Sequence, residues 1–419
     1  MTKQRTLLRV DIRIDQHWAI GAAPDVAFRP DAPDIDYQDR TIRLPIQRDA
    51  SGRVALPATS LVGCLRNHLG AAGDRWLGTS TSSGTQPSAL RTLAATVHTP
   101  DPIQERTTTA VDGDRRAAAA GSLRREELVP PSLVTWWIEW DHRDESLKFA
   151  DLLARLATWH PVVGRRRSAN RGRAHVQQIH DRTIDLTTVE GLTWWLTDRH
   201  TLDWSSADCP PGEEWRRTDG GSADPGTRLA TYTFGVVDGL HIGGAGHTDN
   251  LIHTATTLPS TSWRGVFRHR AEHILRVASP NPDAENHATE TIDRLFGTGR
   301  TKAASETGGR RGILRFAGSE ISAEPSTRTH VAIDRVSGGA AQGTVQDPRD
   351  SSGMLFSVQY FPPETTVALT IFVDGHEQLS AEDRHLIDQI IRDINDGVIG
   401  VGGMTSRGYG TLTLVREDR

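Results

Sequence analysis

The segment LPATSLVGCLR at residues 56–66 recurs as LPSTSWRGVFR at residues 258–268. Both copies follow the pattern L-P-x-T-S-x-x-G-x-x-R, which has too many fixed positions to recur by chance. Apolar residues continue at helical spacing through each copy, so each is expected to begin a helix that a serine or threonine can cap. These apolar positions are Leu61, Cys64, Leu65 and Leu69 in the first copy, and Trp263, Val266, Phe267, Ala271 and Ile274 in the second.

Two further pairs of segments match in the same order along the chain. Residues 109–112 (TAVD), with the Arg/Ala/Gly stretch that follows, resemble residues 330–340 (HVAIDRVSGGA). Residues 163–176 (VGRRRSANRGRAHV) resemble the glycine-rich segment VIGVGGMTSRGYGTLTL at residues 398–414. Three matches in one order indicate a duplicated domain.

Each copy is expected to fold as strand, helix, variable middle, helix and strand. The first strand alternates apolar and polar residues, which predicts one buried face. The second helix of copy one ends before Pro161, and that of copy two begins at Ser380 with Asp383 three residues on. The buried strand positions are Leu8, Val10, Ile12 and Ile14 in copy one, and Ala230, Tyr232, Phe234 and Val236 in copy two.

This order of elements predicts an α+β protein with two ferredoxin-like (RRM-like) domains in tandem. The expected boundaries are 1–185 for copy one, 186–225 for a linker and 226–419 for copy two. The linker holds several tryptophans and is expected to pack in that part, whereas its second half is polar and rich in Gly and Pro.

Composition narrows the class of protein. A formal net charge of −5 does not advertise a nucleic-acid binder, but arginine far outnumbers lysine and gathers in runs at 115–116, 124–125 and 165–167. Arginine's planar fork suits phosphate and stacks on bases. Only Cys64 and Cys209 are present, too few for a disulfide framework, and no apolar run is long enough to span a membrane. We therefore expect a cytoplasmic protein.

The segment GGMTSRGYG at residues 402–410 resembles the C-terminal glycine-rich loop of the RAMP superfamily of CRISPR proteins. Copy one keeps Arg171-Gly172 in place of Arg407-Gly408 but has lost several glycines. The L-P-x-T-S segments are similar to the start of the first helix in the backbone subunits of type III effector complexes. The resemblance covers nearly the whole chain twice, the linker excluded, and implies a fused pair of such subunits.

The resemblance implies a role in antiviral defence, with guide RNA held along its backbone, target RNA paired to it, and other effector subunits as partners. A glycine-rich turn lets backbone amides converge on an anion, and an adjacent arginine adds a charge-assisted bond to phosphate. The candidate RNA-binding residues are Ser60, Arg66, Arg165, Arg166, Arg167, Arg171, Ser262, Arg264, Arg268, Gly402, Gly403, Arg407 and Gly408.

Each copy is also expected to carry a thumb-like insertion. Residues 333–340 resemble the root of the family's thumb, a hairpin that wedges into the guide–target duplex. Residues 105–128 and 328–354 are thus interpreted as protrusions that order on RNA, although Ala/Gly/Arg mixtures of this kind can also be disordered loops. The thumb candidates are Asp112, Arg115, Asp334 and Arg335.

In the resembled subunits, an aspartate between the first strand and the first helix cleaves target RNA with a divalent ion such as Mg²⁺. Asp249 is the candidate catalytic and metal-binding residue of copy two. In copy one the expected position falls near Arg43, and a small shift would recruit Asp39 or Asp36. An acid–base role for His247 is conceivable, but loop histidines are usually bystanders.

Three alternatives remain open. The chain can be a guide-RNA scaffold subunit that does not cleave, with the same fold and the same RNA. It can be a guide-processing endoribonuclease of the same superfamily, although such enzymes usually cut with a histidine and lack paired thumbs. It can also be an unrelated pair of ferredoxin-like domains that binds small molecules. Guide RNA of defined length that co-purifies with the protein would exclude the last of these.

Overall fold

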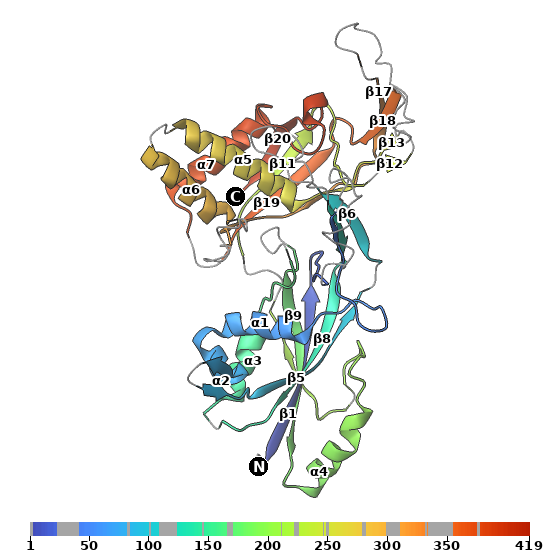
Figure 1. Cartoon of the computed structure of the whole chain (residues 1–419), viewed down its shortest axis with the longest axis vertical. Helices are drawn as coiled ribbons and strands as arrows, with labels where there is room; N and C mark the ends of the chain where they lie inside the picture. Colours follow the sequence, from blue (N-terminus) through green and yellow to red (C-terminus); the bar gives the residue numbers. More distant parts are fainter. Residues whose placement is uncertain are drawn as a thin grey trace, which may run out of the picture. The chain divides into compact units, whose positions relative to one another are not determined.

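The structure is a computed structural model. It describes residues 3–22, 42–81, 84–99, 102–108, 124–144, 146–165, 171–210, 212–221, 226–245, 247–248, 251–278, 282–298, 311–331, 333, 355–374 and 378–419. The chain forms two compact units, and the main boundary between them falls after Pro225. We call them unit one and unit two. Each combines an antiparallel sheet with helices, so the chain is an α+β protein (Figure 1).

The main sheet of unit one has the order β10-β9-β1-β8-β5, and every neighbouring pair is antiparallel. Without the edge strand β10, the strands follow the order fourth, first, third, second along the chain, which is compatible with a ferredoxin-like fold. These strands are β1 (Gln4–Ile14), β5 (Leu90–His98), β8 (Ser132–Trp140), β9 (Ala174–Asp185) and β10 (Arg216–Asp219).

Three helices pack on one face of this sheet: α1 (Ala58–Leu69), α2 (Gly73–Leu77) and α3 (Phe149–Ala157) (Figure 1). The alternating residues of β1 meet them in one core, as predicted, together with Leu61, Leu65, Leu152 and Leu156. The predicted side-chain cap is wrong for α1, because Pro57 stands at its N-cap and no side chain accepts the first amides.

The opposite face of the same sheet is covered as well, which corrects the prediction of a single buried face for β1. Arg9 and Asp11 point to this side and are 1% and 0% exposed. The covering segment belongs to unit one and includes α4 (Val189–Leu196) and the 3₁₀ turn η4 (Asp198–Thr201). Its tryptophans form a second small core against Leu7 and Trp137. The segment expected to be a linker thus packs along the sheet, and β10 extends that sheet.

The main sheet of unit two repeats the same strand order. It runs β15-β19-β11-β20, again antiparallel throughout, which is second, third, first, fourth along the chain. Its core packs against the helices α5, α6 and α7 (Figure 1). The elements are β11 (Thr227–Val236), α5 (Ser260–Ala278), α6 (Pro282–Phe296), β15 (Leu314–Phe316), β19 (Thr366–Val373), α7 (Ala381–Asn395) and β20 (Leu412–Asp418). The predicted start of α7 is confirmed, because Ser380 and Asp383 form a capping box.

Backbone hydrogen bonds also repeat between the units. Trp18 and Val129 exchange N–H···O=C bonds in unit one (3.0 and 2.8 Å), and Leu240 and Phe361 do the same in unit two (2.9 and 2.8 Å). In the turn before the last strand, the Val163 amide donates to the Gly172 carbonyl at 2.8 Å. The Val401 amide likewise donates to the Gly410 carbonyl at 2.9 Å. The two turns therefore close over segments of equal length.

Small sheets accompany each main sheet. One has the order β2-β7-β6, and another has the order β12-β13-β18-β17. β2 runs parallel to β7, and β13 runs parallel to β18. The bounds are β2 (Ile42–Leu44), β6 (Gln104–Thr108), β7 (Arg124–Leu128), β12 (His247–Thr248), β13 (Leu251–Ile252), β17 (Ser326–Val331) and β18 (Leu355–Tyr360). Short two-stranded pairs are β3 (Thr79–Thr81) with β4 (Gly84–Gln86), and β14 (Thr257–Leu258) with β16 (Ser319–Glu320); 3₁₀ turns lie at η2 (Gly70–Ala72) and η6 (Thr405–Arg407).

Candidate nucleic-acid interface

The glycine-rich loop of unit two lies between α7 and β20, and its backbone is tied down at both ends. The Gly403 amide donates to the His241 carbonyl at 2.8 Å, and the Gly410 amide donates to the Gly239 carbonyl at 2.7 Å. Between these anchors the chain makes η6, whose residues are exposed. Among the described residues, the amides of Thr405 and Ser406 have no acceptor, because the first amides of any helical turn lack an internal partner. The loop therefore presents free N–H donors on a fixed backbone.

Aromatic side chains gather beside this loop. The Tyr409 ring is buried, and its hydroxyl lies 2.6 Å from Nε2 of His330 in β17. Tyr360 of β18 meets the Tyr409 ring edge-on, with the centroids 5.7 Å apart. Phe356 of β18 stacks on His330 at 5.3 Å. The glycine-rich loop and the β17–β18 hairpin are thus joined by aromatic contacts.

Two arginines lie on these rings. The guanidinium of Arg328 lies 4.6 Å from the Tyr360 centroid and 5.4 Å from that of Tyr409. Arg407, in η6, lies 5.2 Å from the Phe356 centroid. Within the described part of the chain, neither arginine forms an ion pair. Arg328 donates only a long bond, 3.4 Å, to the Asp238 carbonyl. Stacking on an aromatic face leaves the other guanidinium N–H groups available to bind an anion.

The pKa of His330 responds to the positive charge of the two arginines. Burial lowers the pKa of its imidazole, and the neighbouring Arg328 and Arg407 lower it further. A bound phosphate would offset both arginines, so His330 would then take up a proton more readily. We call Arg328, His330, Phe356, Tyr360, Arg407 and Tyr409 the arginine–aromatic cluster.

The arginines of the repeated helix motif have a different role. In unit one, Arg66 donates to the carbonyls of Leu77 and Gly78 at 3.0 and 2.8 Å, at the end of α2. In unit two, Arg268 donates to the Gly297 carbonyl at 2.5 Å, just after α6. Arg264 donates to the last carbonyl of α6 and is half-buried. Carbonyls at helix ends lack internal partners, and these guanidinium groups satisfy them. The motif repeats here because both copies cap the helix that follows; contact of these arginines with RNA stays a prediction.

Ser60 and Ser262 also differ from their expected role as caps. Each lies inside the first turn, where its amide donates to the carbonyl of the proline three residues earlier, at 2.8 Å for Ser60 and 2.9 Å for Ser262. The proline carbonyl therefore closes both helix starts. The amides of these serines are not free for an anion.

The described arginines of the glycine-poor loop in unit one are engaged internally. Arg171 donates to Glu126 at 2.6 Å, and Arg165 donates to the same carboxylate at 3.1 Å. The Glu126 side chain is 0% exposed and that of Arg171 is 8% exposed. Arg165 also donates to the Leu44 carbonyl at 2.6 Å. These two arginines neutralise a buried carboxylate and hold β2 and β7 together.

The expected match between Arg171-Gly172 and Arg407-Gly408 is also displaced by two residues. Because Gly172 makes the hydrogen bonds of Gly410, Arg171 occupies the place of Tyr409. Both side chains are buried, at 7% and 1% exposure. The Arg-Gly dipeptide of unit one is therefore a core position and not the structural counterpart of the dipeptide of unit two.

Nine of the predicted site residues lie outside the described residues. They are Asp36, Asp39, Asp112, Arg115, Arg166, Arg167, Asp249, Asp334 and Arg335. Asp249 falls between Thr248 of β12 and Leu251 of β13, which pair across that turn. Near Thr248 and Leu251, the described residues include no group of three His, Cys, Asp or Glu side chains that could bind a metal ion.

Two of the three histidines near Asp249 are held by hydrogen bonds. The buried ring of His241 bonds through Nδ1 to the Gln359 carbonyl at 2.8 Å. His253 lies between the side chains of Thr248 (2.9 Å) and Gln359 (3.1 Å). These contacts join Thr248 of β12 and His253, just after β13, to Gln359 of β18. The side chain of His247 is outside the description.

The strand pairing shows which residue of unit one corresponds to Asp249, and it is not Arg43, the position expected from the sequence. Leu44 of β2 and Ile252 of β13 are the last residues paired in parallel with β7 and β18. Counting back along the sequence from these two residues makes Thr41 the counterpart of Asp249. Arg43 instead corresponds to Leu251. Copy one therefore has a threonine at the position of the candidate catalytic aspartate.

Mild acid should destabilise the fold. Burial is the first cause that lowers the pKa values of His98, His142, His180, His241 and His330 below the usual 6.5. Below about pH 6.5 the unfolded chain then binds more protons, so this stability is present at neutral pH and lost as the pH falls through the folded pKa values. We expect urea unfolding to show a lower free energy of unfolding at about pH 5.5 than at about pH 7.5. His98→Gln should make the profile less steep, because it removes one of these five groups. A flat wild-type profile would contradict this prediction.

Strand order and loop define a class: an α+β protein with ferredoxin-like sheets and an anchored glycine-rich loop beside exposed arginine. Residues 233–413, which make up most of unit two, match the family model of the RAMP superfamily. This match supports RAMP membership and suggests a CRISPR-associated, RNA-binding role. RAMP proteins typically work in CRISPR RNA–protein complexes, and the superfamily includes some ribonucleases.

A search of curated proteins finds no match to the chain. None of the helices in the described residues combines the length and the apolar character needed to cross a membrane.

Most of the arginine–aromatic cluster was missed by reasoning from the sequence, which selected only Arg407. Its other members are spread over β17, β18 and the residue after Arg-Gly. The sequence predicts a strand at residues 355–360, and the alternation of side chains in residues 326–331 would have indicated a second one. Nothing in that pattern says that these strands reach the glycine-rich loop.

Proposed function

We propose that this chain is an RNA-binding subunit of a type III CRISPR effector complex, built as a fused double copy of a backbone subunit. Three likenesses between the two units support the duplication. Their main sheets have the same strand order, their last turns are closed by the same hydrogen bond, and the same pair of positions exchanges backbone hydrogen bonds at the strand ends. Each copy is proposed to hold guide RNA through its backbone, with a thumb-like insertion directed at the guide–target duplex. Other effector subunits and target RNA are the proposed partners.

The observation that carries the proposal is the arginine–aromatic cluster beside the glycine-rich loop. Arg328 and Arg407 stack on rings and lack ion pairs among the described residues, whereas most other described arginines have a carboxylate partner or a well-formed carbonyl bond; the one carbonyl contact of Arg328, to Asp238, is long at 3.4 Å. Loop amides without acceptors lie in the same turn as Arg407. Guanidinium groups and free amides together suit phosphate, and they read no sequence. A guide-binding scaffold needs this kind of contact.

Replacing both arginines should weaken RNA binding by about 10- to 100-fold at physiological salt. In single-stranded RNA each lost phosphate contact reduces the slope of log K against log salt by about 0.7, so the double variant should lose about 1.4. The measurement is fluorescence anisotropy of a labelled RNA with full-length Arg328→Ala/Arg407→Ala protein. The matched control is Arg276→Ala/Arg416→Ala, which removes two paired, exposed arginines of the same unit. Equal losses in both variants would defeat the assignment.

RNA content of the native assembly tests the wider role. A guide-binding subunit should co-purify with RNA of defined length. An assembly free of RNA would overturn the proposal and favour a pair of domains that binds small molecules.

Cleavage of target RNA is the second candidate function, and it rests on Asp249. Its neighbours Thr248 and Leu251 belong to the strand pair next to β18, in the same small sheet as Arg328 and Phe356. A carboxylate there would hold a divalent ion, Mg²⁺ being the proposed one. Unit one has Thr41 at the counterpart position, which leaves Asp36 and Asp39 as weaker proposals.

Asp249→Asn should therefore abolish one set of cleavage products. In the assembled complex with complementary target RNA, we expect at least a 100-fold loss of cut rate at that set and unchanged RNA binding. Asp238→Asn, a carboxylate of the same unit, is the control. If the target is still cut at every site, the assignment of Asp249 as a catalytic residue is wrong. The chain is then a scaffold subunit, or its nuclease centre lies elsewhere.

A further inference from the structure

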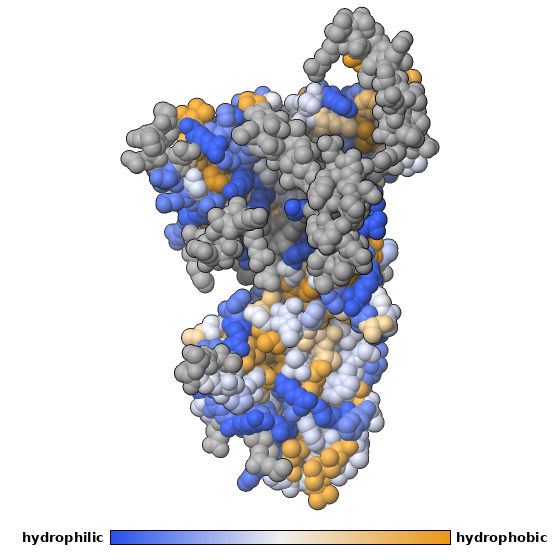
Figure 2. Space-filling model, in the orientation of Figure 1, coloured by the Kyte–Doolittle hydropathy of each residue, from blue (hydrophilic) through white to orange (hydrophobic). Residues whose placement is uncertain are grey.

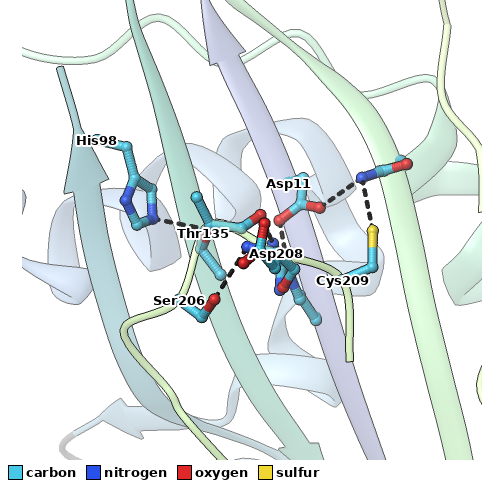
Figure 3. A network of polar contacts seen from close by, with 9 residues as sticks. Asp11, His98, Thr135, Ser206, Asp208 and Cys209 are labelled. Carbon is cyan, nitrogen blue, oxygen red and sulfur yellow. Dashed lines mark hydrogen bonds and ion pairs between the residues drawn. The ribbon is translucent and has the colours of Figure 1, made fainter. Parts of the chain in front are cut away.

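A short segment of unit one crosses the face of the sheet opposite α1, α2 and α3. Arg9 of β1 donates to the carbonyl of Ala207 at 2.7 Å and to that of Asp208. Its Nε donates to Asp11 at 2.8 Å, and both side chains are 1% exposed. Figure 3 shows this network around Asp11 and Asp208. The residues just before Cys209 are therefore fixed on the sheet.

This placement brings three metal-ligating side chains together. Asp11 of β1, His180 of β9 and Cys209 each offer one ligand atom, and these atoms lie within 4.8 Å of one another. It is the one such group among the described residues. Asp11 and His180 share a face of neighbouring strands, so the sheet fixes two of the three ligands. Gln178 lies beside them; its amide donates to Asp11 at 2.8 Å and lies 3.6 Å from the Cys209 sulfur (Figure 3).

His180 supplies an independent indication of a ligand. Its side chain is 6% exposed, and Nδ1 has no hydrogen-bond partner. A buried polar atom without a partner is destabilising, so this nitrogen is expected to have a ligand.

We propose that Asp11, His180 and Cys209 form a site for one transition-metal ion of the zinc class. A carboxylate oxygen, an imidazole nitrogen and a thiolate are all zinc ligands, whereas magnesium and calcium take oxygen donors almost exclusively. On binding, the Cys209 thiol gives its proton to water and its sulfur bonds the ion. The fourth position is left for water, since the sequence offers no second cysteine nearby.

Geometry allows the site to close. Ligand atoms about 2.0–2.3 Å from a tetrahedral ion lie about 3.3–3.8 Å apart, so the group must contract by about 1 Å. Cys209 is exposed and can supply that movement by rotation of its side chain. Gln178 is a positioning residue that holds the carboxylate near the sulfur. A bound ion would fasten the segment around Cys209 to β1 and β9.

Cobalt(II) titration of the full-length protein tests the site directly. We expect one Co²⁺ per chain with thiolate-to-cobalt absorption in the near ultraviolet, and its displacement by Zn²⁺. Cys209→Ser should abolish the thiolate band, and Gln178→Ala should weaken binding about tenfold. Cys64→Ser, at the other cysteine, should change neither. Zn²⁺ should also raise the Tm of the wild type but not that of Cys209→Ser.

The result that overturns the proposal is equally concrete. Absence of the thiolate band would exclude the site, and so would a band that survives Cys209→Ser. Because Cys209 is exposed, its serine variant should fold, and far-ultraviolet circular dichroism checks this. His180→Gln gives a second route, since it removes a ligand without touching either cysteine.

Discussion

Gly410→Ala is expected to lower the free energy of unfolding by about 3–4 kcal/mol, whereas Gly408→Ala should cost only about 1 kcal/mol. Both glycines have positive φ, 87° and 81°, so any other residue pays for a left-handed backbone at either position. They differ in the space available. A Cβ on Gly410 would lie 2.2 Å from the Val401 carbonyl oxygen, whereas one on Gly408 meets nothing within 4 Å.

The extra cost at Gly410 comes from two hydrogen bonds. Relief of the clash must move the Gly410 backbone, which accepts from the Val401 amide and donates to Gly239. Each bond contributes about 1 kcal/mol. Urea unfolding of both variants measures the difference, and Gly172→Ala should behave like Gly410→Ala because its Cβ would lie 1.9 Å from the Val163 carbonyl oxygen. Equal losses for Gly408→Ala and Gly410→Ala would show that φ alone decides the cost.

Local patterns in the sequence predicted the elements and the glycine turn. The period of Leu386, Ile390 and Ile394 places α7, and Ser380 with Asp383 marks its start, because both depend on residues within one or two turns. The first strands of both units were predicted for the same reason. The RAMP resemblance of copy two rested on nine consecutive residues, 402–410, and it agrees with the family match over 233–413.

Such local patterns could not predict which distant residues a side chain contacts. From the sequence, Arg66 and Arg268 are predicted to be positive surface, yet they donate to carbonyls 11 and 29 residues away at the end of another helix. The tryptophans of 194–215 read as part of a linker, because nothing local says that Trp204 and Trp215 meet Trp137 edge-on. Arginine's long stem lets one side chain serve a buried carboxylate, a helix end or a phosphate. The choice among these is made by the fold.

Helix α4, in the segment that was expected to be a linker, carries a stripe of exposed hydrophobic side chains. Val189, Leu192 and Leu196 are 84%, 44% and 61% exposed and recur at helical spacing, and Figure 2 shows hydrophobic colour in the area of α4. Trp194 and Trp195 on the same helix are instead taken up by Arg182 and Arg199, which lie 4.0 and 4.3 Å from their rings. The helix thus uses its aromatic residues to hold unit one and leaves its aliphatic ones free.

Glu126→Val is expected to destabilise the protein by about 3–5 kcal/mol, because it leaves the buried Arg171 without its carboxylate. The Glu126 side chain is 0% exposed and accepts from Arg171 at 2.6 Å and from Arg165 at 3.1 Å. Unit two has apolar or aromatic residues at both equivalent places, Val358 and Tyr409. The double variant Glu126→Val/Arg171→Tyr therefore installs a pairing that the same fold already accommodates.

We expect the double variant to recover about 2 kcal/mol or more of the loss, since replacement of both members of a buried pair is far less costly than removal of one. Arg165, with a side chain 21% exposed, keeps its bond to the Leu44 carbonyl and can turn its charge to water. Asp219→Asn, in an exposed pair, is the control and should change stability by less than about 0.5 kcal/mol. Recovery in the double variant would mean that the two units are interchangeable at this core position. A double variant as unstable as Glu126→Val would mean that the arginine–carboxylate pair of unit one is required by its own surroundings, and that the equivalence of Arg171 with Tyr409 ends at the backbone.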